Sequence, residues 1–163
     1  MRTVTATQTV DSPRERVFEY LSDVSNYAEF SDHYMHDLRL ERLDSRGRGA
    51  SLCFRLAFPL ARQWGDIVLE QLDPPHRIVA KGGMGRVGRI AIECSYTLTT
   101  VAYEMTHVEY RFASKPAKSI DRLREAIGMR FWMTVQARRA LRRLAAVLEG
   151  REQIVAPVRA AAG

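Results

Sequence analysis

The chain has 163 residues, of which 46% are hydrophobic and 27% charged, and its formal net charge is +6. This length predicts one domain with a sizeable core. No run approaches the ~20 apolar residues of a membrane span, and the opening MRTVTATQTV lacks the apolar stretch of a secretion signal, so we expect a cytoplasmic protein. Cys53 and Cys94 are too few for a disulfide framework and lack the spacing of a zinc site.

The first part of the chain predicts one strand followed by two short helices. Residues 3–10 alternate between apolar and polar side chains, as in a strand. In DSPRERVFEYL, Ser12 and Glu15 have the spacing of a capping box around Pro13, which predicts that a helix begins here. The segment DVSNYAEFSDHY predicts a second short helix after Ser25.

Only strands are expected over the next part of the chain. Turn signals such as SRGRG and DPPH separate apolar segments rich in β-branched and aromatic residues. Consecutive strands joined by short turns favour an antiparallel meander, which brings the sheet to seven strands. The six strands that follow the helices are expected at residues 36–44, 50–59, 63–72, 78–81, 89–100 and 103–113.

The stretch GGMGRVG contains Gly83, Gly85 and Gly88 at the spacing of a dinucleotide-binding fingerprint. That fingerprint requires a helix after its glycines, because the pyrophosphate binds at the helix N-terminus. The segment that follows, RIAIECSYTLTT, alternates with period two and predicts a strand. We therefore interpret the glycines as a hairpin turn, and we predict no cofactor.

A long helix is expected over residues 117–150, where the apolar period changes to 3.6. Gly150 is expected to end this helix, and residues 151–163 are predicted to form a flexible tail after a single domain at residues 1–150. The predicted apolar stripe consists of Ile120, Leu123, Ile127, Phe131, Val135, Leu141, Leu144, Ala145 and Leu148.

The same helix is strongly basic. Its cluster of Arg138, Arg139, Arg142 and Arg143 could contact phosphate, but a solvated helix face explains it without a partner. We expect the stems of Arg138 and Arg142 to lie beside the apolar stripe and to cover residues at the sheet edge. A nucleic-acid partner is therefore not expected.

The order of the predicted elements is that of a helix-grip fold of the α+β class, with a curved seven-stranded antiparallel sheet wrapped on a long C-terminal helix. The segments TVDSPRERVFEYLSDVSNYAEF and WGDIVLEQLDPPHRI, together with the terminal amphipathic helix, resemble the polyketide cyclase/dehydrase and lipid-transport family of the START-like (SRPBCC) superfamily. The resemblance covers residues 1–150. It implies an internal cavity between sheet and helix that accepts a lipid, a sterol-like molecule or a polyketide.

Strand and helix periodicity indicate which side chains would line this cavity. Period-two alternation directs the apolar residues of each strand to one face, where the helix must cover them. Buried phenols need a partner, so the tyrosines could orient a polar group of a ligand. The candidate ligand-binding residues are Phe30, Tyr34, Phe54, Leu56, Ile92, Cys94, Tyr96, Tyr110, Ile127, Phe131 and Val135.

The candidate chemistry is sparse. His33 and His36 are three residues apart, but a third ligand at a recognisable spacing is missing, so no metal site is predicted. No inward carboxylate is paired with an inward histidine, which favours binding over catalysis. Binding or transport of an apolar small molecule is therefore the first hypothesis. The alternatives are a polyketide aromatase/cyclase-dehydratase and a ribosome-associated protein that contacts RNA, as in the family's toxin branch.

Overall fold

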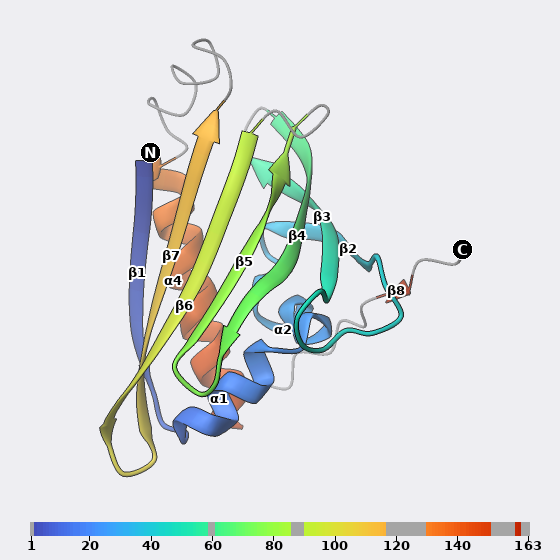
Figure 1. Ribbon diagram of the computed structural model, residues 1–163. Coiled ribbons are helices and arrows are strands. Elements are labelled where there is room, and N and C mark those ends of the chain that lie inside the picture. The colour runs from blue at the N-terminus through green and yellow to red at the C-terminus, as the bar shows by residue number, and fades with distance from the viewer. Residues whose placement is uncertain (1, 59–60, 86–89, 117–129, 151–158, 161–163) are drawn as a thin grey trace.

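A computed structural model describes residues 2–58, 61–85, 90–116, 130–150 and 159–160 of the chain (Figure 1). The N-terminal part forms a strand, two α-helices and a single 3-10 turn, and the remainder forms strands before one long helix. The elements are β1 (Arg2–Val10), α1 (Arg14–Leu21), η1 (Val24–Asn26), α2 (Tyr27–Ser31), β2 (Met35–Leu40), β3 (Ser51–Phe58), β4 (Ala61–Asp73), β5 (Arg77–Met84), β6 (Ile90–Ala102), β7 (Met105–Pro116), α4 (Arg130–Leu148) and β8 (Arg159–Ala160).

The strands form one curved sheet in the order β1-β7-β6-β5-β4-β3-β2-β8. Strands β2 to β7 follow one another as an antiparallel meander, and β1 closes the far edge by pairing with β7. Helix α4 lies along the concave side of the sheet, with α1 and α2 beside it (Figure 1). This arrangement confirms the predicted seven-stranded helix-grip fold, because hydrogen-bonded neighbours in a meander need only the short turns that the sequence contains.

The described part of the tail adds one short feature that the sequence did not predict. The two residues of β8 pair in parallel with β2, Arg159 beside Arg39 and Ala160 beside Leu40. The expectation that residues 151–163 form a flexible tail stays a prediction. The rest of residues 151–163 lies outside the described part of the chain.

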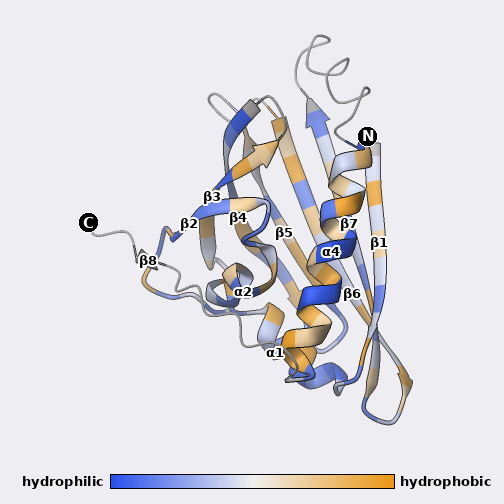
Figure 2. Cartoon of the chain, turned by 180° about the vertical axis from the view of Figure 1, so that it is seen from behind, coloured by the Kyte–Doolittle hydropathy of each residue, from blue (hydrophilic) through white to orange (hydrophobic). Residues whose placement is uncertain are grey.

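Alternation in the strands builds the core as expected. In β6, Ile92, Cys94, Tyr96 and Leu98 are all buried, and the register places Tyr96 beside Tyr110 of β7. Since successive residues of a strand point to opposite faces, one face of each strand is apolar and faces α4. Figure 2 shows hydrophobic and hydrophilic residues interspersed along the strands.

Helix α1 begins without the predicted capping box. Pro13 is extended, with ψ 144°, and stands just outside the helix, so no side chain caps the first turn. Ser12 is buried, and its hydroxyl has no partner. Its carbonyl oxygen instead accepts a hydrogen bond from the Thr106 hydroxyl at 2.8 Å, so this residue anchors β7 rather than the helix.

The glycine segment forms the predicted β5–β6 hairpin, but the strand continues further into it than expected. Gly82 and Gly83 belong to β5, and Gly85 has a φ of +81°, which glycine adopts at little steric cost. A Cβ on Gly82 would overlap the carbonyl oxygen of Asp66 on β4. This glycine therefore allows the two backbones to approach closely where the sheet curves.

Candidate functional site

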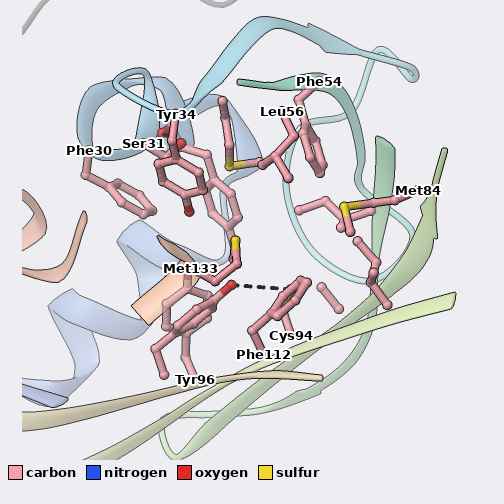
Figure 3. A pocket seen from close by; sticks show the side chains of 16 residues that line it. Phe30, Ser31, Tyr34, Phe54, Leu56, Met84, Cys94, Tyr96, Phe112 and Met133 are labelled. Atoms are coloured by element: carbon pink, nitrogen blue, oxygen red, sulfur yellow. Dashed lines mark hydrogen bonds between the residues drawn. The ribbon is translucent and has the colours of Figure 1, made fainter. Parts of the chain in front are cut away.

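A small cavity lies between the concave face of the sheet and the helices α2 and α4 (Figure 3). Eight of the predicted ligand-binding residues line it: Phe30, Tyr34, Phe54, Leu56, Ile92, Cys94, Tyr96 and Tyr110. Eight further residues line it that the sequence analysis did not name: Tyr27, Ser31, Met35, Ile67, Ala80, Met84, Phe112 and Met133. Strand parity could have identified Ile67, Ala80 and Phe112, which lie in predicted strands, whereas the helical residues depend on how the helices dock on the sheet.

The cavity is much smaller than the ligands that the fold suggests. The gaps between atoms in this region total about 530 Å³, including space open to solvent, but only about 30 Å³ admits the centre of a water-sized sphere. That space holds roughly two water molecules, whereas drug-sized ligands occupy sites of roughly 300–1,000 Å³. A ligand of that size therefore requires the wall to move.

Three methionines supply side chains that can move. Met35, Met84 and Met133 are buried and come from β2, β5 and α4, so they meet the cavity from different sides. Methionine is unbranched and flexible, and it adapts to cavities of different shape at low cost. The wall is thus deformable where these residues lie.

Helix α4 presents a different face to the cavity from the one predicted. Phe131 is 78% exposed and Val135 is 41% exposed, so the prediction that they line the cavity is corrected. The buried face instead carries Met133, Ala137, Ala140, Leu141, Leu144, Ala145 and Leu148. The predicted stripe jumped six residues from Val135 to Leu141, which does not fit a period of 3.6, and it omitted the small alanines. Ile127, the remaining candidate, lies outside the described residues.

Tyrosine hydroxyls are the main polar groups of the cavity. The Tyr27 hydroxyl donates to the carbonyl oxygen of Leu21 at 3.1 Å, and the Tyr110 hydroxyl donates to the Cys94 sulfur at 3.5 Å. Within the described part of the chain, the hydroxyls of Tyr34 and Tyr96 have no hydrogen-bond partner (Figure 3). These two phenols are therefore free to donate to a guest molecule.

Burial keeps these phenols and the nearby thiol neutral. Desolvation raises the pKa of Tyr34 and Tyr96 above the ordinary range for tyrosine. Burial also raises the pKa of Cys94 to about 11, although the hydrogen bond from Tyr110 acts in the opposite direction. At neutral pH the thiol is therefore protonated and weakly nucleophilic. Among the described residues that line the cavity, none carries a charge or an imidazole.

A polar cluster next to the cavity ties α2 to α4. Arg143 of α4 donates to Asp32 at 2.5 Å and to Nδ1 of His33 at 3.1 Å. Burial and, after it, the cations of Arg143 and Arg139 together lower the pKa of His33 to about 4, although a backbone hydrogen bond with Gln136 and the Asp32 carboxylate act in the opposite direction. His33 is thus held neutral by its surroundings, and it does not line the cavity.

Aromatic rings close the rim beside Tyr34. Trp132 is half-buried and meets Tyr34 edge to face with ring centres 6.1 Å apart, and it meets Phe58 in the same way at 5.3 Å. Such edge-to-face pairs are worth roughly 0.5–1.5 kcal/mol beyond their buried area. The rim therefore joins α4 to the end of β3 and holds the Tyr34 ring in place.

The histidine pair of the sequence analysis does not gather metal ligands in the described residues. His36 is exposed on β2, and His33 contacts Arg143. In the part of the chain that the structure describes, no three histidine, cysteine or acidic side chains lie together. None of the described helices is both long enough and apolar enough to cross a bilayer.

Comparison with known proteins places this geometry in context. A family model described as polyketide cyclase/dehydrase and lipid transport matches residues 1–149. No curated protein matches the sequence.

Several solved structures are similar in fold. A protein from Thermus thermophilus is 14% identical with a TM-score of 0.75, covering 93% of this chain and 100% of its own. A major latex-like protein from Panax ginseng is 9% identical with a TM-score of 0.67, covering 90% of this chain and 96% of its own. DynU16, from the dynemicin biosynthetic locus, is 20% identical with a TM-score of 0.59, covering 90% of this chain and 47% of its own. Identities this low establish a shared fold alone.

Proposed function

The chain belongs to the polyketide cyclase/dehydrase and lipid-transport family, and from that premise we propose that it binds an uncharged apolar molecule with oxygen acceptors, such as an aromatic polyketide. The observation that carries this proposal is the pair of unpartnered hydroxyls, Tyr34 and Tyr96, on an otherwise apolar cavity wall. A carbonyl or hydroxyl oxygen of the ligand could accept from either hydroxyl, and such a hydrogen bond contributes about 0.5–1.5 kcal/mol.

The absence of charge on the described cavity wall favours a neutral ligand. A fatty acid would bring a carboxylate into a space where no described lining residue supplies a cation. Moving an unpaired carboxylate out of water is far more costly than moving a ketone. Neutral phenols of raised pKa donate hydrogen bonds but carry no compensating positive charge.

Binding of the ligand would engage the phenols and shift the methionine side chains. Tyr34 and Tyr96 both line the cavity, so oxygens of a bound ligand can accept hydrogen bonds from them. Movement of Met35, Met84 and Met133 would then open room for the apolar rings.

A binding competition tests this proposal. In this assay the protein first binds the neutral probe N-phenyl-1-naphthylamine. An anthraquinone and palmitate are then compared, at the same concentrations, for their ability to displace the probe. We expect the anthraquinone to compete at least tenfold better, since each tenfold step needs only about 1.4 kcal/mol. Equal or better competition by palmitate would refute a neutral ligand.

One matched pair of variants and one double variant locate the site. Ala80 lines the cavity and Ala91 is exposed on β6, so Ala80→Leu should abolish probe binding while Ala91→Leu leaves it unchanged. The double change of Tyr34 and Tyr96 to Phe should weaken anthraquinone binding about tenfold but spare the probe, because naphthylamine accepts hydrogen bonds poorly. Probe binding that persists in Ala80→Leu would place the site elsewhere.

The alternative of a cyclase-dehydratase has less support. Aldol cyclisation needs a general base, and the described cavity wall offers only neutral phenols, a hydroxyl and a thiol. His33, the nearest imidazole named by the sequence analysis, contacts Arg143 instead. Incubation with a carrier-bound poly-β-ketone separates the two functions: binding alone predicts an unchanged product distribution, and Tyr96→Phe should not alter it.

A further inference from the structure

The outward face of α4 combines exposed apolar residues with unpaired arginines. Phe131, Val135, Arg138 and Arg142 follow the spacing i, i+4, i+7 and i+11, which keeps them within roughly 60° of one another on an ideal helix. All four are exposed, and none belongs to the buried face of the helix. We call these four residues the outer stripe. Figure 2 shows α4 from this side, with hydrophilic and hydrophobic bands alternating along it.

The arginines of this stripe are exposed as whole residues. Arg138 and Arg142 were predicted to lie with their stems beside the apolar stripe and their charged heads in water, and their exposure is compatible with that arrangement. The packing of their stems on the sheet edge stays a prediction, and it leaves the charged heads available to a partner.

The outer stripe is also electrostatically uncompensated. In the described residues, Arg143 pairs with Asp32, whereas Arg138, Arg139 and Arg142 form no ion pair. Helix α4 itself contains no acidic residue between its first and last positions. A surface that presents cations together with a large exposed aromatic ring matches an anionic lipid bilayer, where arginines meet phosphates and apolar side chains enter the acyl boundary.

Phe131, the first residue of the outer stripe, lies at the end of α4 that borders the cavity. Three consecutive residues point in three directions: Phe131 faces solvent, Trp132 packs at the rim and Met133 lines the cavity. A bilayer that took up Phe131 would therefore touch the helical turn that closes the cavity.

From these observations we propose that the outer stripe of α4, together with the neighbouring exposed Arg139, docks on an anionic lipid bilayer. Phe131 and Val135 would insert, and Arg138, Arg139 and Arg142 would contact lipid phosphates. This proposal does not depend on which molecule the cavity binds. RNA fits the stripe less well, because phosphate contacts use the arginines but leave the exposed Val135 without a role.

Vesicle co-sedimentation tests the proposal with the full chain. The wild type should bind phosphatidylcholine vesicles that contain phosphatidylglycerol and should bind pure phosphatidylcholine weakly, with binding reduced by salt. Phe131→Ala should weaken binding at least about tenfold, since burial of a phenylalanine side chain contributes that much. Changing Arg138, Arg139 and Arg142 together to Gln should weaken it by about fivefold for each arginine.

Matched controls test whether vesicle binding depends on the outer stripe itself or only on net charge and exposed apolar side chains in general. Leu43→Ala removes an apolar side chain that is even more exposed than Phe131 and does not belong to α4. The triple change of Arg16, Arg42 and Arg48 to Gln removes the same charge from exposed positions outside the helix. Both control variants should keep wild-type vesicle binding.

Three results would overturn the proposal. The first is the absence of binding to anionic vesicles at low salt. The second is an equal loss of binding in the two triple-arginine variants, which would indicate adsorption by net charge. The third is salt-sensitive binding to ribosomes or RNA that depends on Arg138, Arg139 and Arg142 while vesicle binding is absent, which would assign the arginines to RNA.

Discussion

Replacement of His33 by Gln should flatten the acid dependence of the stability of the fold. The ring lies between α2 and α4, where burial and the cation of Arg143 hold its pKa at about 4, below the value of 6.5 for a free histidine. Above pH 6.5 the ring is neutral in both folded and unfolded chains. Between pH 6.5 and 4 the unfolded chain takes up a proton that the folded chain does not, so acid removes stability.

The size of this effect follows from the two pKa values of His33. A difference of about 2.5 between them would correspond to about 3.4 kcal/mol for a fully buried ring. The ring is half-buried, and solvent screening reduces the contribution, so we expect about 2 kcal/mol. As the pH drops from 7.5 to 4, the free energy of unfolding should therefore fall in both proteins. The fall should be about 2 kcal/mol larger in the wild type than in His33→Gln.

Urea unfolding at several pH values measures this difference, because titration of all other groups is common to the wild type and the variant. His36→Gln supplies the matched control, because it makes the same substitution at an exposed position of β2. If the unfolding free energies of the wild type and of His33→Gln fall by the same amount between pH 7.5 and 4, the assigned environment of His33 is refuted.

Three further predictions concern single buried features. Cys94, with a pKa of about 11, should react with Ellman's reagent at pH 8 only as the chain unfolds, whereas the half-buried Cys53 should react in the folded state; equal rates would contradict this. Gly82→Ala should destabilise the fold by on the order of 3 kcal/mol in urea unfolding, because its Cβ would overlap the Asp66 carbonyl, and a loss under 1 kcal/mol would argue against that contact. Ser12→Ala should leave the unfolding free energy unchanged or raise it, since the hydroxyl is buried and unpartnered, whereas a true capping role predicts a loss of about 1 kcal/mol.

The sheet and its cavity-facing residues were readable from the sequence because a strand has a period of two. Once a turn is recognised at each end, parity alone assigns every residue of RIAIECSYTLTT to a face, and Ile92, Cys94 and Tyr96 do reach the cavity. Short turns then order the strands without further information. The family resemblance rested on residues 9–30, residues 64–78 and the terminal amphipathic helix, and the match over residues 1–149 confirms it.

Side-chain packing between distant elements was beyond the reach of the sequence. A helix rich in alanine and arginine contains more than one plausible apolar stripe, and contact with β1 and α2 selected the stripe of Met133 and Ala137 over that of Phe131 and Val135. The volume of the cavity depends on the same packing.

Hydrogen bonds to phenols also require coordinates, because their partners come from residues far apart in the chain. Tyr96 and Tyr110 share one face of the sheet, yet Tyr110 finds the Cys94 sulfur and Tyr96 finds no partner in the described residues. Periodicity places a side chain on a face, but only the tertiary structure decides whether its polar atom is satisfied there, since that depends on angstrom-scale distances between separate elements.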